Sequence, residues 1–510
     1  MITLPTAIVV GAGPGGLAAA MQLANKGYQV EVFEKQAQVG GRTSKLQLND
    51  YSFDLGPTFF MMPQVLEEVF ERVDRNLHDY VTMKEVNPLY TLKFGDIEFT
   101  PSRNVEETAA QIEQLFPGDK KGYRRFMRLE GEKFDRIIEL LKQPFGSIGD
   151  FFTKEMWQAL PKLHAFDTVH GRLSKYFQDE RLKWAFSFQA KYLGMSPWNC
   201  PGTFTILSFL EHRYGLFHPI GGINKVCEAM AQVTEEFGGR IHLNHPVEQI
   251  MVKNGQAVGV RLEDGTECEA DDVVINADFG YAINHLFEPK ALKKYTKEKV
   301  AKKKLSCSTF MVYLGVNQQI DLPHHMVLFA KDYQKNVEDM TERQVLSDEP
   351  SIYVHNPSAI DPTLAPKGKS SLYLLMPVPN LQANIDWDKE KQRLRDWMVQ
   401  KISREAGIED IDALIEEEHI VTPKDWQESY HVYQGATFNL AHSLDQMMYF
   451  RPHNKLEDVE HCYLVGGGTH PGSGLPTIFQ SAMISVDLLT KQYAELSEYS
   501  HQGSRVSYGD

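Results

Sequence analysis

A glycine-rich run near the N-terminus has the residue types and spacing that suit phosphate binding. It reads Gly-Ala-Gly-Pro-Gly-Gly from Gly11 to Gly16, after a β-branched stretch and before an amphipathic one. This pattern predicts strand, tight turn and helix. Gly11 permits the turn, Gly13 lets the backbone approach a pyrophosphate, and Gly16 lets the helix pack on the strand. Because N–H groups at a helix N-terminus attract anions, the unit predicts a dinucleotide site.

An acidic residue follows at the spacing expected of a ribose ligand. A second apolar run, residues 30–33, ends at Glu34. A carboxylate about 20 residues after the glycines accepts hydrogen bonds from ribose hydroxyls and disfavours a ribose phosphate. The nucleotide should therefore be of the FAD or NAD kind.

A second glycine pair distinguishes FAD from NAD. After Lys35, residues 39–43 read Val-Gly-Gly-Arg-Thr, where the glycines let the chain pass close to a ligand and Arg42 can pair with phosphate. Residues 53–58 then read Phe-Asp-Leu-Gly-Pro-Thr. These residues resemble the flavin superfamily that includes amine oxidases, protoporphyrinogen oxidases and phytoene desaturases. The resemblance implies FAD as the cofactor.

Another glycine-rich segment, near the C-terminus, carries the strongest signal. A strand-like run at 462–465 enters Gly-Gly-Gly-Thr-His-Pro-Gly-Ser-Gly-Leu-Pro at 466–476, and a helix is expected to about Leu496. Pro476 suits the first helical turn, whose positive end would face the flavin. This segment closely resembles the C-terminal signature of bacterial phytoene and diapophytoene desaturases, as do residues 451–454.

A meander of short strands is expected in the middle of the chain. Asn-Gly and Asp-Gly turn pairs separate apolar runs after Val247. In the resembling superfamily this meander returns to the nucleotide domain, and the residue matching Val247 contacts the adenine through its backbone. The similarity extends from about residue 6 to residue 490.

The fold class implied is α/β, with a Rossmann-like FAD-binding domain assembled from discontinuous segments and a mixed α+β substrate domain. We assign residues 1–85, 218–289 and 431–496 to the FAD-binding domain, and 86–217 and 290–430 to a domain that faces substrate and membrane. Residues 497–510 read as a polar tail. The residues expected to bind the cofactor are Gly11, Gly13, Gly15, Gly16, Glu34, Lys35, Gly41, Arg42, Thr43, Gly56, Pro57, Thr58, Val247, Gly467, Gly468, Thr469, Gly474, Leu475 and Pro476.

The resemblance implies FAD-dependent desaturation of a linear apolar carotenoid precursor, phytoene or 4,4′-diapophytoene. Such a hydrocarbon offers no polar handle, so the flavin must take a hydride and a base must take a proton. The candidates for acid–base or positioning roles are Asp167, Arg172, Lys175 and His470. His470 could hydrogen-bond the flavin ring or brace the loop that contains it.

Four other functions are compatible with parts of the pattern. A carotenoid oxidase of terminal methyl groups and a carotenoid isomerase share the resemblance. An amine or porphyrinogen oxidase would be expected to carry a polar substrate anchor. A non-enzymatic isoprenoid binder, similar to the Rab GDP-dissociation inhibitors, should lack the flavin-facing features, whereas Arg42 and residues 466–476 favour a flavin.

Composition and charge limit the classes of partner that the protein can have. A net charge of −15 disfavours nucleic acid, and five scattered cysteines predict reduced thiols and no metal site. No second dinucleotide motif is seen, so oxygen or a quinone should reoxidise the flavin. The N-terminus shows no secretion signal and the chain no membrane-spanning run, so we expect a cytoplasmic protein peripherally associated with the membrane.

Two segments bear on membrane contact. Residues 290–304 are rich in lysine and read as a helix, either a solvated face or one attracted to anionic lipid. Residues 145–166 interleave Phe151, Phe152 and Trp157 with lysines, a composition that fits a core helix or an interfacial one.

Overall fold

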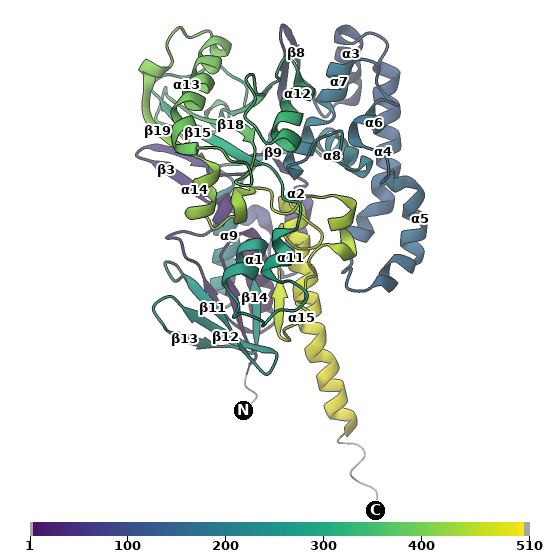
Figure 1. Cartoon of the computed structure of the whole chain (residues 1–510), viewed down its shortest axis with the longest axis vertical. Coiled ribbons are helices and arrows are strands. Elements are labelled where there is room, and N and C mark those ends of the chain that lie inside the picture. Colours follow the sequence, from purple (N-terminus) through teal and green to yellow (C-terminus); the bar gives the residue numbers. More distant parts are fainter. Residues whose placement is uncertain (1–3, 504–510) are drawn as a thin grey trace, which may run out of the picture.

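A parallel five-stranded sheet carries the N-terminal glycine motif in the computed structural model, which describes residues 4–503 and the side chains of residues 4–492 (Figure 1). The strand order is β10 (Arg240–His242), β2 (Gln29–Phe33), β1 (Thr6–Val10), β14 (Asp272–Ile275) and β20 (Cys462–Leu464). Every pairing is parallel. The strands come from widely separated parts of the chain, so the prediction of a Rossmann-like fold built from discontinuous segments is confirmed.

The side chains of β1 alternate between two hydrophobic clusters, as the two-residue period of a strand requires. Ala7 and Val9 pack with the helices α1 (Pro14–Asn25), α9 (Asn224–Glu236) and α15 (Leu475–Gly503). Ile8 and Val10 pack on the opposite face, against the meander and α10 (Phe279–His285). The sheet is thus covered on both faces and places the end of β1 inside the molecule.

The predicted meander is present as β11 (Val247–Lys253), β12 (Gln256–Leu262) and β13 (Glu267–Glu269), paired antiparallel. Asn254 and Gly255 join the first two strands with φ of 52° and 78°. Positive φ at both central residues is what a type I′ hairpin turn demands, and Asn-Gly adopts it readily.

A seven-stranded mixed sheet forms the second large layer, in the upper part of Figure 1. Its order is β19 (Ile415–Val421), β15 (Ser308–Val316), β18 (Ser370–Val378), β17 (Ile352–His355), β16 (His325–Leu328), β7 (Thr91–Phe94) and β8 (Ile97–Phe99). One face packs against α13 (Trp387–Ala406) through Val312 and Leu394. The other face presents Met311 and Tyr373 toward the flavin-binding layer.

Smaller sheets and helices complete the chain. The small sheets are β5 (Phe60–Met61), β9 (Leu216–Pro219) and β6 (Met83–Val86), and β3 (Lys45–Leu48) with β4 (Tyr51–Asp54). The remaining α-helices are α2 (Pro63–Glu71), α3 (Val105–Leu115), α4 (Lys120–Leu141), α5 (Lys154–Leu163), α6 (Val169–Leu173), α7 (Glu180–Ala185), α8 (Ile206–Tyr214), α11 (Lys297–Ala301), α12 (Tyr333–Glu338) and α14 (Pro423–Glu428). α15 begins at Leu475 as predicted and reaches Gly503, and residues 504–510 of the predicted tail lie outside the described residues.

The prediction of a helix throughout residues 290–304 is wrong. Only α11 forms, because the lysines on either side bond to other parts of the chain instead of continuing the helix. Lys294 pairs with Glu457, and Lys304 pairs with Asp445. Within residues 4–503, no helix is both long and apolar enough to cross a bilayer.

Candidate active site

One cavity of about 590 Å³ connects the five-stranded sheet with the apolar part of the molecule. At one end it is lined by the turn after β1, from Gly11 to Pro14, and by the first turn of α15. At the other end it is lined by apolar side chains of α4 and α8. The cavity therefore joins a nucleotide-type site to a hydrophobic space.

Glycine backbone forms the wall of the nucleotide end. A Cβ atom at Gly13 would lie 2.8 Å from Nδ2 of Asn276, and one at Gly16 would clash with the carbonyl oxygen of Gly11. Because Gly13 has no side chain, its backbone lies directly against the ligand space. Because Gly16 has none, α1 can pack on β1, as the sequence predicts. The N-termini of α1 and α15 both line the cavity, and their free N–H groups suit an anionic ligand.

Glu34 is held in place by backbone donors while it lines the cavity. Its carboxylate accepts from the N–H of Ala12 at 2.8 Å and from the N–H of Gln36 at 2.9 Å. Burial raises the pKa of this carboxyl, and the two backbone hydrogen bonds oppose the shift. A carboxyl group anchored in this way next to a pyrophosphate cradle fits a ribose.

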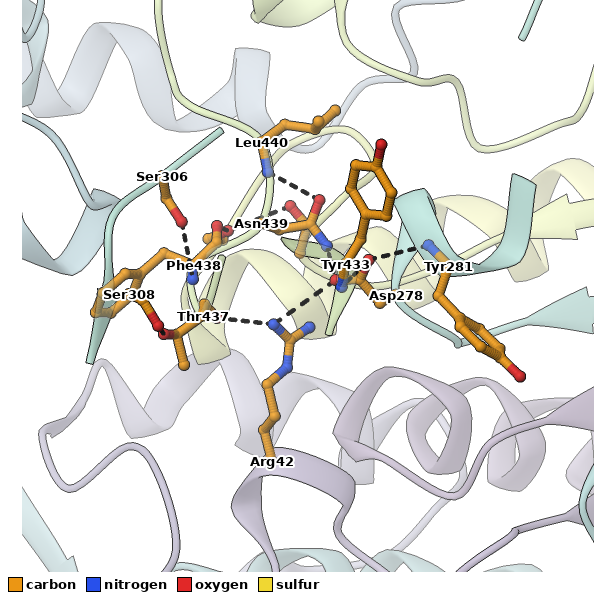
Figure 2. Close-up of polar contacts among 12 residues, drawn as sticks. Arg42, Asp278, Tyr281, Ser306, Ser308, Tyr433, Thr437, Phe438, Asn439 and Leu440 are labelled. Carbon is orange, nitrogen blue, oxygen red and sulfur yellow. Dashed lines mark hydrogen bonds and ion pairs between the residues drawn. The ribbon is translucent and has the colours of Figure 1, made fainter. Parts of the chain in front are cut away.

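Arg42 ties the 40–43 turn to two other segments (Figure 2). It donates to the carbonyl oxygen of Thr437 at 2.7 Å and lies 4.0 Å from the carboxylate of Asp278. Asp278 also accepts from Nδ2 of Asn439 at 2.6 Å and caps α10 through the N–H of Tyr281. Burial raises the pKa of Asp278, and Arg42 lowers it. The sequence alone did not single out Asn276, Asp278 or Asn439 as site residues.

The C-terminal glycine segment is braced from behind by Arg451, which is 1% exposed. Its guanidinium donates to the carbonyl oxygens of Gly467 at 2.6 Å and Thr469 at 3.2 Å. Burial lowers its pKa to about 9. Asn454 adds a bond to the carbonyl oxygen of His470. Residues 451–454 of the desaturase-like signature thus shape the loop.

The structure brings together most residues predicted to bind the cofactor. Those that line the cavity are Gly11, Gly13, Glu34, Lys35, Gly41, Arg42, Thr43, Gly56, Pro57, Thr58, Val247, Gly467, Gly468, Gly474, Leu475 and Pro476. Gly15, Gly16 and Thr469 lie behind this wall. The donors, the glycine cradle and the two helix ends fit FAD.

The candidate catalytic residues lie outside the cavity lining. Asp167 pairs with Lys175 at 2.7 Å, and Arg172 donates to the hydroxyl of Tyr176. His470 is hydrogen-bonded through Nε2 to the carbonyl oxygen of Gln143, and burial lowers its pKa to about 4. These contacts support the bracing alternative for His470, and none of the four candidates is among the cavity-lining residues.

The other end of the cavity is hydrophobic. Its walls include Phe134, Ile137 and Leu141 of α4, Leu207 of α8, and Phe188. Because apolar walls favour an apolar ligand and exclude water, this arm suits a hydrocarbon.

Lys191 also lines the cavity, and sequence reasoning did not select it. Its ammonium lies 4.7 Å from the centroid of the Tyr333 ring, and among the side chains of residues 4–492 no carboxylate forms an ion pair with it. Burial lowers the pKa of Lys191 to about 8. An amine with such a pKa can accept a proton at pH values close to 8 and above.

A Rossmann-like sheet, a glycine-walled dinucleotide site and an adjoining apolar cavity define an FAD-dependent oxidoreductase. The chain belongs to the flavin-containing amine oxidoreductase family, whose model matches residues 14–489, and within it to the carotenoid desaturases. It is 45% identical over 486 residues to a 4,4′-diapophytoene desaturase (4,4′-diapolycopene-forming) of Methylomonas sp, covering 95% of each chain. It is 36% identical to an all-trans-zeta-carotene desaturase of Myxococcus xanthus, covering 95% of this chain and 93% of that one.

A solved structure shows the same fold at low identity. Putrescine oxidase bound to putrescine matches with a TM-score of 0.61 at 14% identity, covering 96% of this chain and 99% of that one. At this identity the likeness concerns the fold alone.

Proposed function

We propose that the protein desaturates the thirty-carbon precursor 4,4′-diapophytoene, in the manner of its Methylomonas relative. When bound, FAD supplies the hydride acceptor, and the chain must orient the hydrocarbon, exclude water and remove a proton. The observation that carries the proposal is the single cavity, in which apolar walls run directly into the glycine-walled flavin site. The thirty-carbon length rests on the activity of the 45% identical Methylomonas relative, a 4,4′-diapophytoene desaturase.

A chromatographic assay tests the reaction and the chain length together. FAD-loaded protein is incubated with liposomes that contain 4,4′-diapophytoene or phytoene, and the extracted polyenes are separated. We expect conjugated products, with the thirty-carbon substrate converted faster. Absence of new polyenes from either substrate would overturn desaturation, and faster conversion of phytoene would overturn the chain length.

A cavity-filling variant tests the location of the substrate. Leu207→Trp places an indole in the apolar arm, and we expect at least a tenfold loss of conversion at unchanged flavin content. Val345→Trp adds the same ring at a side chain that is 45% exposed and outside the cavity, and it should retain activity. Equal activities in the two variants would exclude this arm as the substrate site.

Lys191 is our first candidate for the proton acceptor, because it lines the apolar arm, is half-buried and has no carboxylate partner among the described side chains. Asp167 and Arg172 remain positioning candidates. The N–H of Gly202 bonds to the carbonyl oxygen of Asp167 at 2.8 Å, and the next two residues, Thr203 and Phe204, line the cavity.

We further propose that the protein docks on the membrane through an apolar patch next to the cavity. The patch consists of exposed large hydrophobic residues, namely Ile148, Phe152, Trp157, Leu160, Phe166 and Phe450. α5 buries Met156 and Ala159 and exposes Trp157 and Leu160, so the interfacial interpretation of residues 145–166 is favoured over a purely core helix.

The patch adjoins both the cavity and a cationic flank. Leu141 at the end of α4 lines the cavity, and soon after it Phe145 contacts Phe151, whose ring lies 6.4 Å from that of Phe450. On the far side, the ammonium of Lys294 lies 5.8 Å from the ring of Tyr449. Lysines beside an apolar patch favour an anionic bilayer, from which a water-insoluble substrate can enter.

Oxygen or a membrane quinone is the proposed electron acceptor. Among the described residues the five-stranded sheet is the one dinucleotide-type fold, which favours an acceptor without a nicotinamide domain. A quinone could reach the flavin from the same bilayer.

A further inference from the structure

Three buried histidines meet where the small β9 sheet approaches the seven-stranded sheet. His218 lies in β9, His324 immediately precedes β16, and His355 ends β17. Their exposed fractions are 0%, 5% and 0%. One ring nitrogen from each lies within 4.8 Å of the other two. These residues are outside the cavity and take no part in the function proposed above.

The spacing within the cluster suits a bound ion. Nε2 of His324 and Nε2 of His355 are 3.3 Å apart. A tetrahedral metal ion bound about 2.0–2.1 Å from each nitrogen separates two such ligands by about 3.3 to 3.4 Å. A hydrogen bond between the rings would explain this pair alone, and it would leave Nδ1 of His218 without a partner.

The unsatisfied nitrogens supply a second observation. Nδ1 of His218, of His324 and of His355 are all buried without a hydrogen-bond partner. Buried polar atoms are costly when unpartnered. A bound ion would satisfy Nδ1 of His218, because Nε2 of that ring already bonds to Asp361.

Buried carboxylates lie on the His218 side of the cluster. Asp361, which is 0% exposed, lies 3.0 Å from Nε2 of His218 and accepts the proton there. This bond leaves the lone pair of His218 on Nδ1, as in the carboxylate–histidine–metal arrangement of many metal sites. Asp54 is 4% exposed, and its Oδ2 is buried without a partner.

We propose that His218, His324 and His355 bind one divalent transition-metal ion of the zinc type, with Asp361 as the outer carboxylate. Imidazole nitrogens suit zinc, and the absence of thiolates in the cluster disfavours Cu(I). The ion joins β9, β16 and β17 behind the cavity wall. Tyr353 of β17 lies on that wall, and its hydroxyl contacts Thr58 and His325. The sequence predicted no metal, because the three histidines are far apart in the chain.

Metal analysis of the FAD-loaded, full-length protein, purified without a histidine tag, tests the proposal. We expect about one zinc ion per chain, and at least a tenfold lower content in His355→Gln. His212→Gln is the matched control, because His212 is 1% exposed and bonds to Tyr123 outside the cluster. Asp361→Asn should keep the fold and weaken zinc affinity roughly 10–100-fold.

If His355→Gln does not fold, the effect of Zn²⁺ on the Tm of the other variants tests the site instead. After dialysis against a chelator, added Zn²⁺ should raise the Tm of the wild-type protein, and of His212→Gln, more than that of Asp361→Asn. Sub-stoichiometric metal in the wild type together with a Tm unaffected by Zn²⁺ would overturn the site. Flavin content, measured in the same samples, separates this outcome from a failure of the proposed function.

Discussion

At the scale of single residues, we propose that Gly13 approaches the pyrophosphate of FAD and that Glu34 binds its ribose. Gly13→Val would place a branched side chain against Asn276 and into the cradle, and Glu34→Arg would replace a ribose acceptor with a cation. We expect both to lower the flavin bound per chain at least tenfold, measured by the visible absorbance of the purified protein. As a control, an added Cβ in Gly146→Ala meets no atom within 4 Å and no left-handed backbone opposes it, so this variant should retain flavin. Unchanged flavin content in the first two variants would contradict the assigned site.

Lys191 gives a prediction about pH. Burial lowers its pKa to about 8, so the amine is protonated below that pH and able to accept a proton above it. Turnover should therefore rise by up to tenfold per pH unit below about pH 8 and level off above that pH. Lys191→Met should remove this limb and reduce turnover roughly 10²–10⁴-fold at unchanged flavin content. If this variant kept near wild-type turnover and the same pH profile, another group would have to be the proton acceptor.

Arg451 illustrates what a motif does not say about its residues. The sequence likeness marks 451–454 as a signature, but the four carbonyl groups that Arg451 bonds belong to Leu440, Gln446, Gly467 and Thr469. These partners are set by how three separate segments meet, which no local pattern encodes. The role as a brace therefore became visible only in the fold.

At the scale of elements, α5 and the turn before it form the exposed apolar patch. Replacing Phe152 and Trp157 with serine removes two large side chains that are 70% and 63% exposed. Because these rings are solvated in the folded protein, stability should change little, whereas membrane partitioning should fall. We expect several-fold less protein to sediment with anionic liposomes, at an unchanged Tm.

Two further variants complete that experiment. Changing the exposed Lys297 and Lys302 to glutamine should weaken sedimentation mainly at low salt, since their attraction to lipid is electrostatic. Val345→Ser removes an exposed apolar residue away from the patch and should bind like the wild type. Equal sedimentation of all variants would exclude the patch as the docking surface.

Local patterns were sufficient to predict the elements of the nucleotide domain. The β-branched run of β1, the glycine turn and the Asn-Gly hairpin each specify their own geometry. The lysine-rich segment 290–304 shows the limit of such reasoning, because ion pairs with Glu457 and Asp445 decide its course.

At the scale of the whole molecule, strand pairing between distant parts of the chain forms features that local sequence patterns could not predict. β7 pairs in parallel with β16, more than 200 residues away, and this pairing closes the sheet behind the cavity. The histidine cluster and the position of Lys191 depend on the same assembly. The family resemblance nevertheless anticipated the cofactor and the order of segments around it, since those rest on short glycine motifs.

The central claim is that flavin and hydrocarbon react within one continuous cavity. The most direct test is the visible spectrum of FAD-loaded protein mixed, without oxygen, with liposomes that contain 4,4′-diapophytoene. We predict that the flavin absorbance bleaches while bands of a longer conjugated polyene appear, and that Leu207→Trp slows both changes together. A flavin that stays oxidised, with no new polyene bands, would contradict the account.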